Sequence, residues 1–384
     1  MKGPLNQACL AISLAILGCA AAGAQSPRVL GYYPSWGKTQ TPPYRAANIP
    51  YAKLTHVLHA FLLADKAGVG TLNVPGDLLE PELISRAHAA GVKVSISVGG
   101  ASGVQKKAFR SIAANPAYRA AFAQNLHNFV ATNGYDGVDI DYEVPVTEAD
   151  KNNCTLMMQA IRAEFPPPLL VSMAVTFNPP GYGNFDIQAL TPTVDFFNVM
   201  TYDFHGPWTN HTGHNSPLIL SPADPGQEGS LKVSIDLYRN TFGVPAEKLN
   251  IGTAFYGYQF NDAGPLWAFC SPYCQNTVSE NYGTYIKQRI NAMGWVSEYD
   301  NVGRAPYLLE SSGSNGFITY DDIASTERKA IYVLGMRKLG GIFTWELSAD
   351  YDGRTQDLMA AMYLGSLKAA GPSALWPEDL SNLP

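Results

Sequence analysis

Apolar residues along the chain gather in eight short runs, most of which end at glycine, proline or a polar cluster. The runs are rich in β-branched residues and nearly unbroken in hydrophobicity, which is typical of strands covered on both faces, as in parallel sheets. We therefore predict eight strands, at residues 28–33, 55–63, 92–98, 137–143, 169–177, 194–202, 249–257 and 340–347.

Helical patterns fall between these runs. Asn115 and Pro116 form a good cap and first-turn pair, and apolar residues then recur at helical spacing up to Gly134. Ser325 is predicted to cap a further helix that ends at Gly340. Eight strands alternating with helices predict an α/β fold, a (β/α)8 TIM barrel.

The chain is longer than the roughly 250 residues that such a barrel needs. The largest gap, between the seventh and eighth strands, is too long for a plain loop and predicts a small α+β insertion. The expected organisation is a catalytic barrel at 25–257 and 321–365, an insertion domain at 258–320 and a C-terminal tail at 366–384.

The first 24 residues have the pattern of a removable export signal. Lys2 is the only charge before residue 28, an apolar stretch follows it, and small residues at 22–24 predict cleavage before Gln25. The protein is therefore expected to be secreted. A lipoprotein signal ending at Cys19, with a lipid anchor there, or a periplasmic location is the alternative. No later stretch reaches the ~20 apolar residues of a transmembrane segment.

The 384 residues carry a formal net charge of -6, and no basic run is present, which argues against nucleic acid as a partner. An oxidising compartment favours a disulfide between Cys270 and Cys274, with Cys154 a buried thiol. No histidine accompanies these cysteines at metal-ligand spacing, so no metal and no cofactor is predicted. A monomer is the default expectation.

The most informative stretch is DGVDIDYE at 136–143. Alternate residues of a strand share one face, so Asp139, Asp141 and Glu143 point the same way. Buried together, three carboxylates repel one another and resist desolvation, which predicts a chemical role. Glu143 would stand at the C-terminal end of the fourth strand, where barrel enzymes carry their catalytic groups. Asp136, off this face, is interpreted as structural.

Two non-catalytic interpretations of the acidic stretch are the alternatives. One is a set of salt-bridged barrel carboxylates, and the other is a divalent-metal site, because carboxylates suit magnesium or calcium. No matching carboxylates or histidines occur at the adjacent strand ends.

These residues, with other motifs in order, resemble glycoside hydrolase family 18, the chitinase family. The resemblance covers about residues 28–365 and the subgroup that carries an insertion before the eighth strand. It rests on the acidic motif DGxDxDxE and on GYYPSW (31–36), SVGG (97–100), MTYD (200–203), the FHGPW and TGHNSPL sequences that follow, and GGIFTWELSAD (340–350).

The resemblance implies hydrolysis of β-1,4-linked N-acetylglucosamine chains with retention, assisted by the substrate itself. Glu143 would be the general acid, and the 2-acetamido oxygen of the sugar would attack C1. Asp141 would orient that acetamido group, Asp139 would share a proton with Asp141, and Tyr202 would hydrogen-bond the acetamido carbonyl.

The resemblance also implies residues that bind substrate. These are Tyr32, Phe61, Met200, Asp203 and Trp345, and, with core packing as the alternative, Trp36 and Trp208. Ser97, Gly99 and Gly100 are expected to be structural. Family structures suggest non-proline cis peptides after Ala60 and after Trp345. His205 and His214 are interpreted as loop or support residues.

The expected ligand is chitin or a chitooligosaccharide. One alternative is an endo-β-N-acetylglucosaminidase acting on N-glycans, and another is a non-catalytic chitin-binding lectin. Such lectins generally lose the acid, and this chain keeps Glu143. Endo, exo or processive action stays open.

Overall fold

The computed structural model describes residues 26–143, 145, 147–177, 185–261, 263–311, 316–377 and 380. The predicted signal peptide at 1–24, including Cys19, lies outside the described residues. Within them, no helix is both long enough and apolar enough to cross a membrane.

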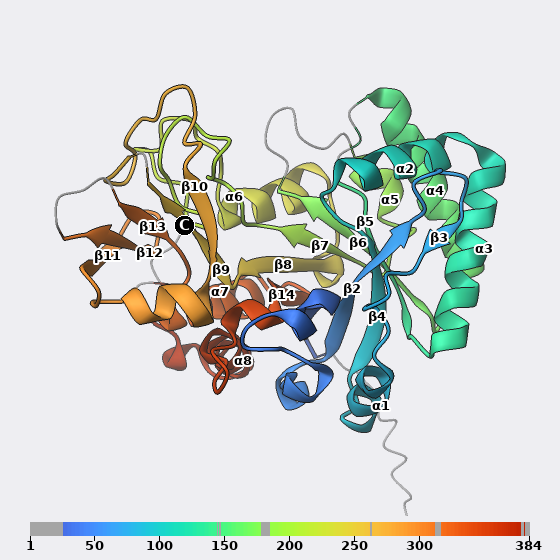
Figure 1. Cartoon of the computed structure of the whole chain (residues 1–384), viewed down its shortest axis with the longest axis horizontal. Coiled ribbons are helices and arrows are strands. Elements are labelled where there is room, and N and C mark those ends of the chain that lie inside the picture. Colours follow the sequence, from blue (N-terminus) through green and yellow to red (C-terminus); the bar gives the residue numbers. More distant parts are fainter. Residues whose placement is uncertain are drawn as a thin grey trace, which may run out of the picture.

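Eight parallel strands close into a barrel, which confirms the predicted TIM-barrel fold (Figure 1). Each strand pairs with the next in the order given, and the last pairs with the first. The strands are β1 (Arg28–Pro34), β2 (His56–Ala64), β4 (Lys93–Gly99), β5 (Gly137–Asp141), β6 (Leu170–Thr176), β7 (Phe196–Met200), β8 (Leu249–Ala254) and β14 (Gly341–Trp345). A two-residue strand, β3 (Leu72–Asn73), pairs antiparallel with β2.

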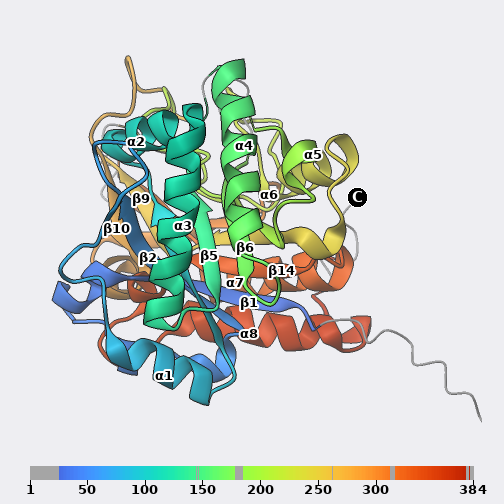
Figure 2. The ribbon, with the colours of Figure 1, turned by 90° about the vertical axis from the view of Figure 1, so that its right-hand side faces the viewer.

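Helices cover the outside of the barrel, where α3 and α4 lie side by side (Figure 2). The α-helices are α1 (Pro81–Ala89), α2 (Gly103–Ala114), α3 (Pro116–Asn133), α4 (Glu148–Glu164), α5 (Ile187–Leu190), α6 (Leu231–Asp236), α7 (Ile323–Ala330) and α8 (Asp357–Ala370). Short 3-10 or π-helical turns are η1 (Ser35–Thr39), η2 (Ala46–Asn48), η3 (Tyr51–Lys53), η4 (Leu237–Thr241), η5 (Ala246–Lys248), η6 (Tyr282–Ile286), η7 (Lys287–Arg289), η8 (Ile331–Met336), η9 (Leu347–Asp350) and η10 (Ser373–Leu375).

The ends of α3 follow the sequence prediction. The Asn115 side chain accepts from the backbone N–H of Ala117 and Tyr118, Pro116 is the first helical residue, and Gly134 ends the helix in the left-handed conformation at φ 76°. The predicted cap of α7 is wrong. Asp322 caps that helix and accepts from the backbone N–H of Ser325 at 2.7 Å, while the Ser325 hydroxyl accepts from the Asp322 N–H. The two residues form a capping box that begins the helix earlier.

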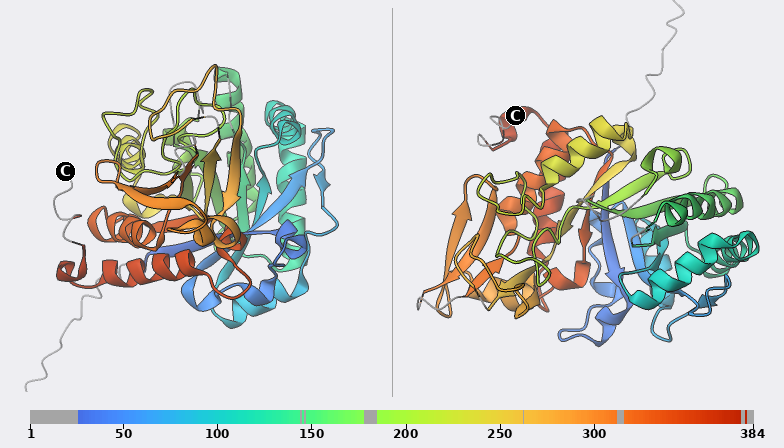
Figure 3. Two further views of the ribbon diagram at one scale, coloured as in Figure 1. Left: turned by 60° about the vertical axis from the view of Figure 1, so that its left-hand side comes forward. Right: turned by 90° about the horizontal axis from the view of Figure 1, so that it is seen from above.

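The residues that follow β8 and precede β14 in the sequence form a second, antiparallel sheet, which lies beside the barrel (Figure 3). Its order is β10 (Thr277–Asn281), β9 (Tyr256–Phe260), β13 (Phe317–Thr319), β12 (Ala305–Glu310) and β11 (Trp295–Asp300). The seventh apolar run thus divides at Phe255, a fully buried residue whose N–H bonds to the carbonyl of Trp345. Residues before it join the barrel, and residues after it join the second sheet.

The loop between β9 and β10 contains the predicted disulfide, Cys270–Cys274. Cys154, on α4, is a buried free thiol. The main apolar core fills the space between the barrel strands and the surrounding helices. The barrel interior is different in character, because polar side chains of β4, β5, β6, β7 and β8 gather there and define the site described next.

Candidate active site

Asp139 is buried at the centre of the barrel and is held by four hydrogen-bond donors. Its Oδ2 accepts from Tyr32 at 2.9 Å and from Ser97 at 2.8 Å. Its Oδ1 accepts from Ser172 at 2.7 Å and from Asn198 at 3.0 Å. Burial raises the pKa of the Asp139 carboxyl, and the four hydrogen bonds oppose that rise.

Behind Asp139, a relay of polar side chains crosses the barrel. Asn250 donates to Asn198 at 2.8 Å, and Arg28 donates to Asn250 at 2.9 Å. The guanidinium of Arg28 therefore closes a chain of oriented amides that ends at the Asp139 carboxylate. This chain fixes the direction of each amide dipole without a direct ion pair.

Asp141 is the next residue along the same face of β5, and its hydrogen bonding differs from that of Asp139. Among the described residues, its Oδ1 is buried and accepts no hydrogen bond. Burial raises the pKa of Asp141 well above the ordinary value, and the charges of Glu143 and Asp139 raise it further. The four hydrogen bonds to Asp139 come from Tyr32, Ser97, Ser172 and Asn198 and none from Asp141, so the expected proton sharing between the two aspartates stays a prediction.

Glu143 lies two residues past the end of β5, at the C-terminal mouth of the barrel. Its side chain is 22% exposed, and its Oε2 lies 3.7 Å from Lys106 Nζ on α2. Burial raises the pKa of Glu143; Lys106 opposes that rise, and the negative charge of Asp203 adds to it. Sequence reasoning missed Lys106, because a lysine on an amphipathic helix carries no sign that it points inward.

Gly99 and Gly100 allow the end of β4 to approach β5 closely. Gly99 has a φ of 123°, and a Cβ there would lie 2.2 Å from the carbonyl oxygen of Asp141. The N–H of Gly100 donates to that same carbonyl at 3.0 Å, and a Cβ on Gly100 would press against the ring of Phe61. The two glycines thus position the backbone that carries Asp141.

Aromatic rings form one side of the barrel mouth. Trp345 stacks on Phe61 with ring centroids 5.6 Å apart, and Tyr32 meets Trp345 edge-on at 5.3 Å. Trp36, which is 37% exposed, lies 6.1 Å from Phe61 and 6.2 Å from Trp345. Both predicted non-proline cis peptides are present, at Ala60–Phe61 and at Trp345–Glu346.

Asp203 follows β7 and is held by two tyrosines from the second sheet. The hydroxyls of Tyr256 and Tyr258, both on β9, donate to Asp203 Oδ1. Asp203 has a φ of 62°, unusual for a residue other than glycine, and its N–H donates to Asn215 at 2.8 Å. Burial raises the pKa of Asp203 against the effect of the tyrosines.

Tyr202 and Met200 complete this side of the mouth. Tyr202 is buried, with its ring edge-on to Tyr256 and to Phe343. Gly252 on β8 leaves room for it, since a Cβ there would lie 2.7 Å from the Tyr202 ring. Met200 ends β7 and is partly buried beside the same aromatic cluster.

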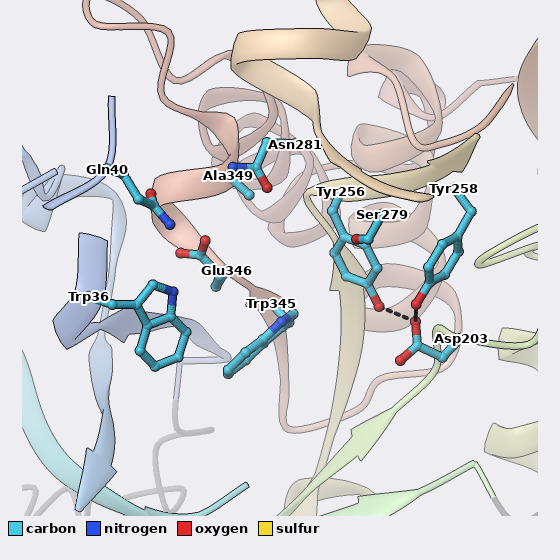
Figure 4. A pocket seen from close by; sticks show the side chains of 10 residues that line it. All are labelled: Trp36, Gln40, Asp203, Tyr256, Tyr258, Ser279, Asn281, Trp345, Glu346 and Ala349. Atoms are coloured by element: carbon cyan, nitrogen blue, oxygen red, sulfur yellow. Dashed lines mark hydrogen bonds between the residues drawn. The ribbon is translucent and has the colours of Figure 1, made fainter. Parts of the chain in front are cut away.

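A pocket of about 270 Å³ lies between these two sides (Figure 4). Asp203 with its two tyrosines is on one side, Trp36 is on the other, and Trp345 lies between them. The full lining is Trp36, Gln40, Asp203, Tyr256, Tyr258, Ser279, Asn281, Trp345, Glu346 and Ala349. The pocket therefore joins the barrel mouth to β9 and β10 of the second sheet, and Glu143 is not among the residues that line it.

Glu346 is an acidic lining residue that sequence reasoning did not single out. It is buried and accepts hydrogen bonds from the N–H of Ser348 at 2.6 Å and from the Ser348 hydroxyl at 2.7 Å. Burial raises the pKa of Glu346 to about 7, against those hydrogen bonds. Tyr256 and Tyr258 were missed as well, because the sequence hides the break at Phe255 that turns them toward Asp203.

Trp208 and Asp136 are among the predicted residues that do not line the pocket. Trp208 is 43% exposed and meets Tyr258 edge-on at 5.7 Å, so it is close to the Asp203 group without lining the pocket. Asp136 precedes β5 at the opposite end of the barrel, where it accepts from the Val94 N–H at 2.7 Å and pairs with His88 at 2.8 Å. Its place fits the structural interpretation.

The described residues contain one group with metal-ligand chemistry, formed by His205, His211, Asp224 and Glu228. It lies in the segment between β7 and α6 and is considered separately below.

A closed parallel barrel whose mouth gathers carboxylates and aromatic rings at the C-terminal strand ends has the architecture of a barrel enzyme that cleaves glycosides. Residues 28–350 match glycosyl hydrolases family 18, and the chain belongs to that family.

Similar proteins are found in several bacteria. Chitinase A1 of Niallia circulans is 28% identical over an alignment that covers 91% of this chain and 60% of that protein. Chitinase ChiA74 from Bacillus thuringiensis superposes with a TM-score of 0.78 at 25% identity, covering 90% of this chain and 70% of that one. A family 18 N-acetylglucosaminidase from Paenibacillus barengoltzii superposes with a TM-score of 0.75 at 26% identity, covering 88% of this chain and 99% of that one. The chain thus spans less than two thirds of the length of the first of these relatives.

Proposed function

We propose that the protein is a secreted chitinase that hydrolyses β-1,4-linked N-acetylglucosamine chains with retention, and that Glu143 is its general acid and base. The observation that carries the proposal is the series of Asp139 and Asp141 on one face of β5 and Glu143 two residues beyond the end of that strand. It runs from a tightly held buried carboxylate to a partly exposed one at the barrel mouth. Membership of family 18 and similarity to chitinases support the same substrate class.

In the first step, Glu143 gives its proton to the glycosidic oxygen as the bond from that oxygen to C1 breaks. A carboxyl that donates a proton must hold it near working pH, and burial together with Asp203 raises the pKa of Glu143. The carbonyl oxygen of the 2-acetamido group forms the new bond to C1, which gives an oxazolinium ion. Water then opens this ion on the opposite face while Glu143 takes back a proton, and the configuration is retained.

Asp141 suits the task of orienting the acetamido group. Its Oδ1 accepts no hydrogen bond from the described residues, so it is available to accept one from the acetamido N–H. A negative Asp141 would also offset the positive charge that develops on the ring. Asp139, held by four donors, keeps the strand face fixed beneath it.

The aromatic side chains provide the binding surface. Trp345, backed by Phe61 and Tyr32, offers a flat face for a sugar ring. Asp203 is fixed by its two tyrosines and can accept from sugar hydroxyls, and Tyr202 would donate to the acetamido carbonyl. Trp36 and Trp208, both exposed, would extend the contact along the chain.

The products distinguish this proposal from its alternatives. The wild-type protein is incubated with a hexamer of N-acetylglucosamine and, separately, with a glycoprotein that carries N-glycans, and the new reducing ends are followed by NMR. The proposal predicts cleavage of the hexamer with β-anomers formed first. Release of N-glycans alone would indicate the other glycosidase, and binding without cleavage would indicate a lectin. Secretion is checked separately by sequencing the N-terminus of the exported protein, which is expected at Gln25.

A further inference from the structure

Four metal-ligating side chains converge in the segment between β7 and α6, outside the pocket. The atoms are Nε2 of His205, Nε2 of His211, one carboxylate oxygen of Asp224 and one of Glu228, all within 4.8 Å of one another. His205, His211 and Asp224 are buried, and the Glu228 side chain is 24% exposed. None of the four has a part in the chemistry proposed above.

The other nitrogen of each imidazole is already occupied. His205 Nδ1 lies 2.9 Å from the carbonyl oxygen of His214, which can only accept, so Nδ1 carries a proton. His211 Nδ1 lies 2.9 Å from the side-chain oxygen of Asn210 in the same way. In the neutral tautomers that these contacts select, both Nε2 lone pairs face the two carboxylates. Histidines that bind metals are held in this manner, through a hydrogen bond from the second nitrogen.

Four of the six distances between the ligand atoms, those from each histidine to each carboxylate, fit tetrahedral coordination, and all four atoms lie within 4.8 Å of one another. His205 Nε2 lies 3.4 Å from Asp224 Oδ1 and 3.3 Å from Glu228 Oε2. The same two distances from His211 Nε2 are 3.1 and 3.4 Å. Zinc bonds of about 2.0–2.2 Å at the tetrahedral angle place neighbouring ligand atoms about 3.3–3.5 Å apart. Direct hydrogen bonds between an imidazolium and a carboxylate are shorter, about 2.7–2.9 Å.

The surroundings of Glu228 are a second observation, independent of the distances, that indicates a ligand at this site. Its Oε2 is buried and, among the described residues, makes no hydrogen bond of good geometry, although two imidazole nitrogens lie within 3.4 Å. A Cβ on Gly226 would lie 1.9 Å from the other oxygen of this carboxylate, and a Cβ on Gly213 would lie 2.2 Å from the His205 ring. Glycine at both positions leaves the space that lets the two ligands turn inward.

We propose that His205, His211, Asp224 and Glu228 bind one Zn²⁺ ion in a structural site. Two imidazoles with two carboxylates suit zinc, whereas calcium and magnesium prefer ligand sets made of oxygen alone. Four protein ligands leave no open position for a reacting water. The site revises the prediction of no metal, which considered histidines beside the cysteines and at the strand ends next to the acidic stretch, but not within 205–228.

The ion would brace one wall of the pocket. His205 is two residues from Asp203, and the loop that contains the disulfide is bonded to the same segment: the N–H of Cys270 donates to the carbonyl of Asn210 at 2.7 Å, and that of Cys274 to Thr209 at 2.8 Å. Trp267 from that loop lies against both His205 and His211. Loss of the ion would therefore loosen the segment that positions Asp203 and Trp208.

The direct test uses the untagged full chain, because a histidine tag would bind metal by itself. Elemental analysis of the protein purified with micromolar zinc is expected to give about one zinc per chain. Dialysis against a chelator should remove the metal and lower Tm by several degrees, and one equivalent of Zn²⁺ should restore it. Cobalt in place of zinc should give the visible absorption of a four-coordinate site.

Variants locate the ion. Glu228→Gln, the change least able to disturb folding because that side chain is partly exposed, and His211→Gln should lower the zinc content at least tenfold. His127→Gln, on the outer helix α3, is the matched control and should bind as wild type does. If the chelated wild type takes up no zinc and its Tm is unchanged, the four side chains are a proton-linked ion network and the proposal is overturned. It is equally overturned if both ligand variants keep a full equivalent of zinc.

Discussion

Lys106 Nζ lies 3.7 Å from Glu143 Oε2, so helix α2 supplies a cation to the proposed general acid. A positive charge at this distance favours the ionised carboxylate and lowers its pKa, against the effect of burial. The balance between the two sets the pH at which Glu143 loses its proton.

Replacing Lys106 by methionine should shift the alkaline limb of the kcat/KM profile to higher pH. Without the cation, the pKa of Glu143 rises, so the acid stays protonated further into the alkaline range. The measurement is kcat/KM on a chitooligosaccharide from pH 4 to pH 9. Lys107→Met, on the exposed face of the same helix, is the control and should leave the profile unchanged. A profile for Lys106→Met that overlays the wild type would show that Glu143 does not govern this limb.

Ser95 and Ser97, two buried residues of β4, should differ in how much stability the protein loses when the hydroxyl is removed. Ser97 donates to Asp139, and loss of a hydrogen bond to a charged group costs about 1.5–3 kcal/mol. Ser95 Oγ is buried without a hydrogen-bond partner among the described residues, so Ser95→Ala should be neutral or slightly stabilising. Denaturant unfolding of Ser97→Ala and Ser95→Ala measures the difference. Equal losses of stability would contradict a special role for the contact with Asp139.

Glu346 should make the protein less stable as pH rises. The pKa of its carboxyl is about 7 in the folded chain and 4.5 ordinarily, so the folded state binds this proton more tightly than the unfolded state does. Its contribution to stability, about 3 kcal/mol at most, is fully present below pH ~4.5 and is lost as pH rises through 7.

Glu346→Gln should flatten that dependence, because a glutamine can still accept from the Ser348 N–H and carries no charge. Comparison of the free energies of unfolding at pH 5 and pH 8 gives the answer. Parallel slopes for wild type and variant would indicate that other groups cause the pH dependence.

Trp345→Ala should weaken binding of chitooligosaccharides. Loss of the ring removes the flat apolar surface that Phe61 and Tyr32 support. The expected cost of about 1.5–3 kcal/mol corresponds to about a ten- to hundredfold increase in Kd. Trp345→Phe should retain part of the affinity. Calorimetric titration of both variants measures it, and an unchanged Kd for the alanine variant would place the sugar elsewhere.

The barrel was predictable from the sequence, and so was the rim at which the acidic and aromatic side chains gather, because the C-terminal ends of parallel barrel strands meet at one rim wherever they occur in the chain. Asp139, Asp141 and Glu143 alternate along one strand, and Trp345 ends another. The alternation of residues along a strand and the position of a strand end are local features, so they can be recognised in a single sequence.

The rest depends on contacts that no local pattern encodes. Lys106 resembles any surface lysine of a helix. The zinc ligands proposed above are spread over 24 residues of irregular segment, so no helical or strand spacing marks them as neighbours. Ser325 fits a cap, yet Asp322 caps the helix because its carboxylate lies one position before the first turn and accepts the Ser325 N–H. In each case the deciding partner lies outside the local sequence pattern.

The most direct test of the proposed function compares Glu143→Gln with wild type on N-acetylglucosamine oligomers, following both hydrolysis and binding. Glu148→Gln, an exposed residue at the start of α4, is the matched control. Loss of a general acid should lower kcat by about 10²–10⁴-fold, while Kd stays within a few fold of wild type. A Glu143→Gln variant that turns over its substrate as fast as wild type would show that another group donates the proton.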